Sequence, residues 1–384
     1  MFKKIENFFD SFYNAPVSIP AGIYLYQAPP ESALPYKLHL RVEADGSGIL
    51  IINAHTVLHL NQTAAEFAYH LMQGKDKSAS AATVAERYKI PLEIAQKDQD
   101  EFLGKIEMLV SSQDVDPDTF LDAERVAPYS QKLSAPYRLD CALTYRVSEG
   151  TATSVAPTER VSRELTTEEW KTLLKNAWEA GIPHVIFTGG EPTLREDLPE
   201  LVSEAEKLGL VSGLLTDGHK LAEKKYTQEL LKRGLDHILL LADDGEKRFW
   251  NALKVLMPLD IAVSVHATLT HENCKNFAKL LEKIAKTGVK NISLSASESG
   301  LGDELAKAGH KAAELGLTQV WDLPVPYSAF HPAALELAGE EVPQGAGKAW
   351  LYVEPDGDVL PAQGVNRVLG NLLTDPWRKI WKRR

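Results

Sequence analysis

An alternation of short apolar segments with amphipathic helical patterns, running over residues 138–321, most constrains the fold of this chain. The expected strands are 138–145, 184–187, 211–215, 237–241, 261–266, 292–295 and 318–321. Strands joined through helices run parallel, because a crossover of that length returns the chain to the same end of the sheet. The spacing therefore predicts six or seven βα units in a parallel sheet, either open or closed into a barrel.

The helix expected after the first strand carries a clear start signal. Thr166 and Glu169 have the spacing of a capping box, and Leu165 and Trp170 are placed as a hydrophobic staple. Further helices are expected over 197–208, 226–233, around 250, and over 273–287 and 303–315.

The front of the chain follows a different order, with two or three short strands followed by helices. Residues 36–42 alternate apolar and polar side chains, Asp45-Gly46-Ser47-Gly48 supplies a turn, and 49–52 reads as the partner strand. Asn61 is placed to cap a helix over 63–72, and helical patterns follow over 81–88 and 94–110. Residues 113–136 contain several prolines and little periodicity, so a linker is expected there.

Bulk properties limit the classes of function. A length of 384 residues fits two or three domains, and a formal charge of −11 argues against general nucleic-acid binding. No apolar run approaches the roughly 20 residues that span a bilayer, and residues 1–20 are expected to form a short amphipathic helix rather than a signal peptide. These features predict a cytoplasmic protein with no membrane partner. The cluster of basic residues at 378–384 reads as a solvated helix end.

The most informative segment is "VIFTGGEPTLREDLPELVSEAEKLG", which begins at Val185. Its glycines Gly189 and Gly190 and the following Glu191 come at the carboxyl end of a buried strand, where parallel-sheet proteins bind ligands. Glycine allows the backbone to approach a ligand closely, and a glutamate accepts hydrogen bonds from an ammonium group.

This segment resembles the motif with which radical-SAM enzymes hold the amino group of S-adenosylmethionine. "LLTDGHKL", one βα unit later, resembles the Thr-Asn-Gly segment of the same superfamily, with Asp217 where asparagine is common. The resemblance implies a partial parallel TIM-type barrel over 137–325. It also implies a pocket for S-adenosylmethionine that includes Gly189, Gly190, Glu191, Pro192, Thr216 and Asp217.

Two flanking segments resemble other parts of such proteins. Residues 21–112 resemble the PqqD-like winged-helix domain that recognises leader peptides of ribosomally made, modified peptides, which implies a peptide partner held at a sheet edge. Residues 326–384, with a hairpin around Asp356-Gly357, resemble the SPASM or twitch extension, in which a cysteine is expected near Ala362 to ligate an auxiliary cluster.

The chain departs from the radical-SAM pattern at the iron–sulfur cluster. The superfamily carries C-x3-C-x2-C after the first strand, and these thiolates bind the cluster. The aligned positions here are Val147, Thr151 and Ser154, and the chain has only two cysteines, Cys141 and Cys274. Cys141 lies on the strand itself and is expected to be a buried apolar residue. The histidine pairs 55/59 and 266/271 have no convincing carboxylate partner, so neither a metal site nor a cluster is expected.

The sequence thus predicts an α/β protein that acts in peptide modification without a cluster. The leading hypothesis is a pseudoenzyme or scaffold that binds a precursor peptide or an active homologous partner. The first alternative is an enzyme that binds S-adenosylmethionine and transfers a group by polar chemistry. A base would then come from the acidic or imidazole side chains near strand ends, namely Asp217, Asp243, His266 and Asp322. The second alternative is an inactivated version of a radical-SAM peptide-modifying enzyme.

Overall fold

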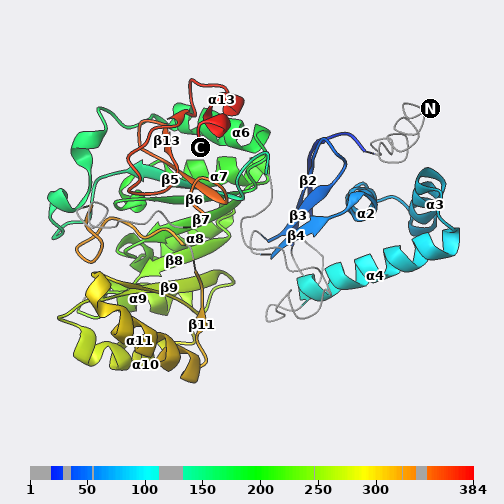
Figure 1. The fold of residues 1–384 in the computed structure, drawn as a ribbon. Helices are drawn as coiled ribbons and strands as arrows, with labels where there is room; N and C mark the ends of the chain where they lie inside the picture. The colour runs from blue at the N-terminus through cyan, green and yellow to red at the C-terminus, as the bar shows by residue number, and fades with distance from the viewer. Residues whose placement is uncertain are drawn as a thin grey trace. The chain divides into compact units, whose positions relative to one another are not determined.

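The computed structural model describes residues 19–28, 36–53, 56–111, 133–245, 247–321, 323–333 and 344–384. The chain divides into two compact units, Met1–Ser130 and Gln131–Arg384 (Figure 1). The helix expected over 1–20 and the linker expected over 113–136 fall almost entirely outside the described residues, as does Asp322. Among the described helices, none combines the length and the apolar character needed to cross a membrane.

The N-terminal unit is an antiparallel sheet followed by three helices. Its strands β1 (Gly22–Gln27), β2 (Lys37–Val42), β3 (Gly48–Ile52) and β4 (Thr56–Leu60) pair in chain order. The helices are α2 (Gln62–Met72), α3 (Lys77–Tyr88) and α4 (Leu92–Ser111). The expectation of two or three strands was too low, because β1 reads "GIYLYQ" and lacks the apolar–polar alternation of β2.

Side-chain caps fix where two of these helices begin. Asn61 accepts a hydrogen bond from the backbone N–H of Ala64 at 2.9 Å, which confirms the predicted cap of α2. Asp76 accepts from Ala79 N at 3.0 Å and starts α3 four residues before the predicted residue 81. That helix was predicted too short because its first turn, Lys77 to Ser80, lacks apolar side chains apart from Ala79.

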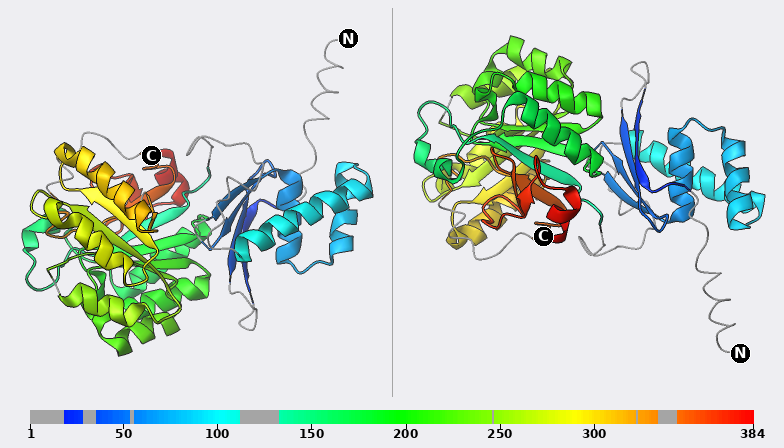
Figure 2. Two further views of the ribbon diagram at one scale, coloured as in Figure 1. Left: turned by 90° about the horizontal axis from the view of Figure 1, so that it is seen from below. Right: turned by 90° about the horizontal axis from the view of Figure 1, so that it is seen from above.

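The C-terminal unit is built on a ten-stranded sheet of order β11-β10-β9-β8-β7-β6-β5-β12-β13-β14. The seven strands β5 to β11 are mutually parallel, as predicted, and cover Arg138–Thr144, His184–Gly189, Val211–Thr216, His237–Leu241, Ala262–Leu269, Asn291–Ala296 and Thr318–Gln319. The intervening helices α6 to α11 cover Thr167–Glu179, Leu198–Leu208, Lys224–Lys232, Lys247–Leu256, Phe277–Ala285 and Gly302–Glu314. Figure 2 shows these helices along one face of the curved sheet.

The C-terminal residues extend this same sheet. Strand β12 (Trp350–Val353) pairs in parallel with β5, and β13 (Asp358–Leu360) and β14 (Gly370–Asn371) follow antiparallel before the short helix α13 (Trp377–Lys382). Strand β5 is therefore an interior strand, which explains why residues 139–144 are all buried. In the described part of the chain β11 and β14 each pair on one side only, so the sheet is seen as an open arc.

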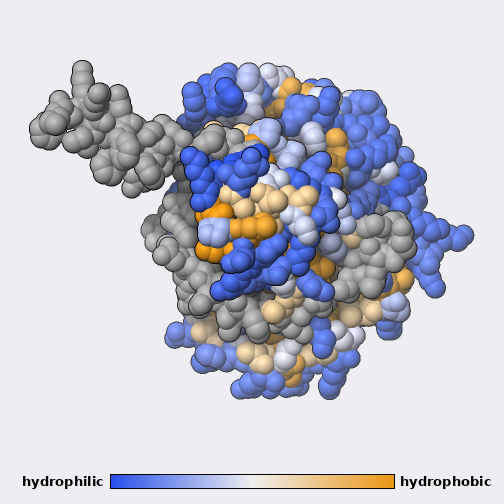
Figure 3. Space-filling view, turned by 90° about the vertical axis from the view of Figure 1, so that its right-hand side faces the viewer, coloured by the Kyte–Doolittle hydropathy of each residue, from blue (hydrophilic) through white to orange (hydrophobic). Residues whose placement is uncertain are grey.

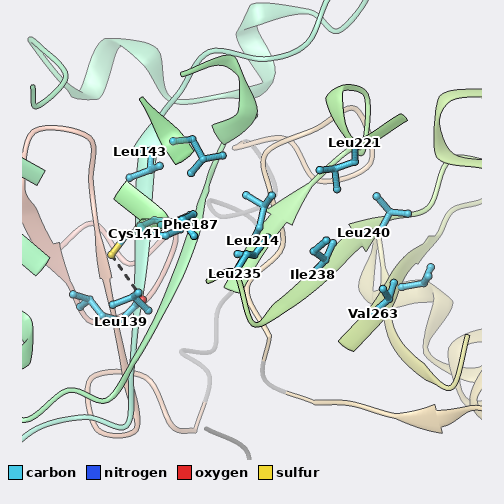
Figure 4. Close-up of a cluster of buried hydrophobic side chains, with 14 of the residues drawn as sticks. Leu139, Cys141, Leu143, Phe187, Leu214, Leu221, Leu235, Ile238, Leu240 and Val263 are labelled. Atoms are coloured by element: carbon cyan, nitrogen blue, oxygen red, sulfur yellow. Dashed lines mark hydrogen bonds between the residues drawn. The ribbon is translucent and has the colours of Figure 1, made fainter. Parts of the chain in front are cut away.

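The main core lies between the parallel strands and the helices. Leu139, Cys141 and Leu143 point from β5 into it, beside Phe187 of β6 and Leu214 of β7 (Figure 4). Cys141 is fully buried, its Sγ lies 3.9 Å from the carbonyl oxygen of Leu139, and burial raises the pKa of its thiol. The interpretation of Cys141 as an apolar core residue is confirmed. Because successive side chains alternate across a strand, Asp140, Ala142 and Thr144 face the other side of the sheet.

The predicted capping box at the start of α6 is present, and its contribution to stability can be measured. Thr166 Oγ1 accepts from Glu169 N, and the Glu169 carboxylate accepts from Thr166 N at 2.9 Å. We expect Thr166→Ala to lower the free energy of unfolding by about 1 kcal/mol, because one backbone donor of the first helical turn loses its partner. Urea denaturation measures this, and Thr172→Ala, with an exposed hydroxyl bonded within the same helix, serves as the control.

Candidate active site

A cavity of about 240 Å³ opens at the carboxyl ends of the first parallel strands. The strand ends contribute Gly190, Glu191, Asp217, Leu241 and Asp243 to its wall. Residues Val147 to Thr151, which follow β5, form a second part of the wall. The remaining lining comes from Arg248 and Phe249 of α9 and from residues 326–330. The cavity therefore lies at the carboxyl edge of the parallel sheet, where the sequence analysis predicted a ligand site.

Glu191 is the central acidic group of the cavity and is only 2% exposed. Its Oε1 accepts hydrogen bonds from Thr193 N at 2.9 Å and from Thr216 Oγ1 at 2.8 Å, and its Oε2 accepts from Asp217 N at 2.8 Å. Burial, followed by the nearby Asp217 carboxylate, raises the pKa of Glu191. A cation bound in the cavity would offset both effects, so the arrangement favours a positively charged ligand group.

The two glycines before Glu191 are required by the chain's own backbone. A Cβ on Gly189 would lie 2.2 Å from the carbonyl oxygen of Thr144, and a Cβ on Gly190 would lie 2.1 Å from that of Arg146. Gly190 N donates to Thr144 O and Glu191 N donates to Arg146 O, both at 2.8 Å. Close approach to a ligand is the reason that the sequence predicts for this Gly-Gly pair. The structure adds a second reason, a close contact with the segment that leads from β5 into the loop at 147–151.

The other residues of the predicted pocket shape it from different positions. Asp217 lines the cavity, and its Oδ1 also accepts from His219 N at 2.8 Å, as in an Asx turn. Thr216 is buried and holds Glu191 through its hydroxyl. Gly189 and Pro192 are not part of the wall; Pro192 begins a short 3₁₀ turn that presents Thr193 to Glu191.

Of the candidate bases, Asp217 and Asp243 line the cavity and His266 does not. Asp243 lines the cavity as expected and accepts from Gly245 N at 3.1 Å. His266 was also expected at this mouth, but it does not line the cavity. It is fully buried, with Nδ1 and Nε2 each 3.0 Å from the hydroxyls of Ser293 and Ser295, and burial lowers its pKa to about 3. Both ring nitrogens of His266 are thus within hydrogen-bonding distance of serine hydroxyls inside the sheet, away from this cavity. Asp322 lies outside the described residues.

The three positions aligned with cluster cysteines have taken other roles. Val147 packs against a buried cluster that includes Tyr145, Ala156, Tyr327 and Tyr352. Thr151 contributes to the cavity wall, and Ser154 is exposed on a 3₁₀ turn. An aliphatic side chain and two hydroxyls are not ligands for a soft iron–sulfur centre.

Ala362, near which a cysteine for an auxiliary cluster was expected, also cannot ligate a metal. Ala362 is 3% exposed and carries only a methyl group. Throughout the described residues no group of three or more histidine, cysteine, aspartate or glutamate side chains is placed to hold a metal ion. The residues present therefore do not fit an iron–sulfur cluster held by three thiolates.

A buried polar network anchors the segment between β5 and α6. Glu354, at the end of β12, accepts from Tyr145 Oη at 2.8 Å and from Arg160 Nε at 2.6 Å. Arg160 also donates to Tyr327 Oη at 3.2 Å. Arg160 belongs to the segment between β5 and α6, so this network joins that segment to the C-terminal strands and to the chain at 327.

The sequence analysis did not predict several contributors to the cavity. Arg248 and Phe249 lie in the first turn of α9, and their position directly after β8 was the signal that would have found them, since helix starts meet strand ends in βα units. Residues 326–330 carry no periodic pattern. They reach the site because Tyr327 N donates to Gly189 O at 3.0 Å and Ala333 N donates to Val155 O at 2.7 Å.

The C-terminal unit is thus an α/β structure with a parallel sheet and a buried glutamate at its carboxyl edge, and part of it is similar in sequence to a known superfamily. Residues 141–295 match the sequence profile of the Radical SAM superfamily.

Named relatives are PqqA peptide cyclases. The protein from Streptomyces rochei is 26% identical over 278 residues, which is 65% of this chain and 76% of that protein. The protein from Xanthomonas oryzae pv. oryzae (strain MAFF 311018) is 31% identical over 253 residues, or 57% of this chain and 66% of that protein. A further relative, from Granulibacter bethesdensis, is matched over only 40% of its length.

Solved structures of Streptococcus suis SuiB share the fold. The free protein superposes with a TM-score of 0.58 at 15% identity and covers 90% of this chain and 86% of that chain. The form bound to its precursor peptide SuiA gives 0.56 at 17% identity, with 89% and 86% covered.

Proposed function

We propose that this chain acts in the modification of a ribosomally made peptide, and that it binds the peptide and an adenosyl compound without generating a radical. The named relatives are PqqA peptide cyclases, and SuiB has been crystallised with a precursor peptide. In this proposal the chain is a scaffold that presents the peptide or assembles with an active homologous enzyme.

The proposal rests on a difference between two sides of the cavity, the side that contains Glu191 and the loop that faces it. On one side of the cavity Glu191 lies with Gly190 and Asp217, held by hydrogen bonds from Thr193, Thr216 and the backbone of Asp217. The facing loop offers Val147 and Thr151 where a cluster would need thiolates. An electron therefore has no route from a cluster to the ligand, while binding of the ligand itself needs no metal.

S-adenosylmethionine fits the residues that remain. Glu191 would accept from its ammonium group, and Asp217 is placed to accept from a hydroxyl. When bound without a cluster, the sulfonium compound supplies an electrophilic carbon. The cavity also holds Asp243, so group transfer to a peptide nucleophile, with Asp217 or Asp243 as the base, is the second candidate function.

Peptide binding is assigned to the N-terminal unit. Among its described residues β1 and β4 are paired on one side only, so each presents a sheet edge to which an extended peptide can add as a strand. The same unit exposes Leu92 and Ile94 at the start of α4, which are 45% and 49% exposed. Figure 3 shows, on the face that it presents, apolar side chains surrounded by polar ones. Such a surface suits a peptide with aliphatic side chains.

The test combines metal analysis with ligand binding. We expect the protein to retain no stoichiometric iron or sulfide after anaerobic reconstitution, and to bind S-adenosylmethionine with micromolar affinity in titration calorimetry under air. A radical-SAM protein with three cysteines, reconstituted in parallel, controls for the procedure. Retained iron and sulfide would contradict the cluster-free proposal, and absence of binding would remove the adenosyl ligand from it. Release of S-adenosylhomocysteine on addition of peptide would favour the group-transfer enzyme over the scaffold.

A further inference from the structure

The solvent-exposed face of α13 (red in Figure 1) is entirely basic. From Trp377 to Arg384 each exposed residue is a lysine or an arginine, while Ile380 is buried and Trp377 and Trp381 are half-buried. The exposed residues, which we call the basic face, are Arg378, Lys379, Lys382, Arg383 and Arg384. The whole chain has a formal charge of −11, so this face is opposite in sign to the protein that carries it.

The stability of the helix does not explain the basic face. Arg378 lies four residues before Lys382, and like charges at that spacing are neighbours on a helix and repel each other. The same holds for Lys379 and Arg383. A helix dipole favours cations in the last turn, but Arg378 lies in the first turn of α13, where the dipole disfavours a cation. An anion outside the helix explains the charge of this face better than the helix itself does.

The carboxylate of Asp375 offsets only part of this charge. It pairs with Lys379 at 2.5 Å, and its second oxygen accepts from Asn371 N at 3.0 Å. In the part of the chain that the structure describes, Arg378 and Lys382 form neither an ion pair nor a hydrogen bond. These two side chains are therefore the members of the basic face that are best placed to bind an external anion.

The tryptophans of α13 indicate which class of anionic partner fits. Trp377 and Trp381 stack with their ring centroids 5.3 Å apart, and the Arg384 guanidinium covers the Trp381 ring at 3.5 Å. Their indole N–H groups donate to the backbone carbonyls of Ser134 and Leu133. The rings are thus engaged within the protein and are poor platforms for nucleic-acid bases. The basic face also exposes no apolar side chain that could insert into a membrane interface.

We propose that the basic face of α13 binds a segment of another polypeptide that is rich in aspartate and glutamate. Carboxylates accept charge-assisted hydrogen bonds from guanidinium and ammonium groups. The charges extend along the whole helix, so an extended acidic segment can contact several of them at once. The interaction needs neither the adenosyl ligand nor the cavity, and it therefore goes beyond the proposed function.

The test titrates the protein into a fluorescent peptide of about ten residues that alternates glutamate with glycine, and follows its anisotropy. We expect binding at low salt that weakens at least tenfold at about 0.3 M salt, because exposed charges are screened. Arg378→Glu combined with Lys382→Glu should weaken binding at low salt at least tenfold. Lys224→Glu combined with Lys225→Glu, at exposed positions of α8, changes the net charge equally and should change binding less than twofold.

Several outcomes would overturn the proposal. If both double variants weaken binding equally, only the net charge matters and the basic face is not the site. Absence of peptide binding at low salt contradicts it directly. Tighter binding of a single-stranded RNA of equal charge, or of phosphatidylserine vesicles, would assign the face to another class of partner. Arg378→Gln with Lys382→Gln should give a smaller loss than the reversal, and an unchanged urea midpoint in these variants shows that they are folded.

Discussion

Gly190→Ala is expected to lower the free energy of unfolding of the C-terminal unit by at least about 3 kcal/mol, because the new methyl group has no space. Its Cβ would lie 2.1 Å from the carbonyl oxygen of Arg146 and 2.9 Å from the carbonyl carbon. The neighbours are backbone atoms held by the hydrogen bonds between Gly190, Glu191 and the segment Thr144 to Arg146, so they cannot move aside as a flexible side chain would. Chemical denaturation followed by tryptophan fluorescence measures the loss.

A matched substitution shows whether the effect comes from the contact or from glycine itself. A Cβ on Gly302, at the start of α11, meets no atom within 4 Å, so Gly302→Ala should be neutral or slightly stabilising. If Gly190→Ala costs no more than Gly302→Ala, the Gly-Gly pair is not required by the backbone, and close approach to a ligand remains as the predicted explanation.

The affinity of the cavity for S-adenosylmethionine is expected to fall at least 100-fold in Glu191→Gln, about 2.7 kcal/mol, because a buried ammonium loses its only fully buried counter-charge in the wall. The same group sets the pH dependence. Burial and Asp217 raise the pKa of Glu191, so the carboxylate is increasingly protonated as the pH falls through that raised value. Affinity should therefore rise with pH, and binding should release a proton, which calorimetry in buffers of different ionisation enthalpy detects.

The ligand-free protein should show the opposite trend. A carboxyl group whose pKa is raised by folding binds more protons in the native state than in the unfolded state. Its contribution to stability is therefore lost as the pH rises from the ordinary glutamate value through the raised one. Glu196→Gln, at an exposed position of the same loop, is the control and should leave both pH profiles unchanged. Proton release that persists in Glu191→Gln would assign the titration to another group.

The sequence predicted those parts of the fold that depend on local sequence patterns. The strand–helix alternation identified the parallel strands β5 to β11 but not β12, and the capping box at Thr166 placed the start of α6. Glu191 was identified because its glycines follow a buried strand. The pairing of segments that are distant in the sequence could not be predicted from it. No local pattern indicates that Trp350 aligns with Arg138, or that Tyr327 returns to Gly189.

The site was therefore predicted in part. Glu191, Asp217 and Asp243 lie in one cavity as expected, since strand ends on one edge converge. His266 was misplaced because its strand, β9, continues to Leu269, so this histidine lies within the sheet and not at its end. Arg248 was missed although its position directly after β8 indicated it, and Ser148 was missed because a single serine carries no pattern. Only the folded chain shows that both line the cavity.

The pairing of β12 with β5 also governs the order in which this protein can fold during synthesis. Residue 350 leaves the ribosome 212 residues after residue 138, which is about 10 to 40 s at ordinary elongation rates. Until then β5 has β6 on one side and an open edge of unpaired amides and carbonyls on the other. For that whole interval the nascent chain thus carries a strand with an unpaired edge, four of whose seven side chains are apolar. Its yield in cells should depend more on chaperones, and on translation speed over the last segment, than that of a protein whose central strands pair in order.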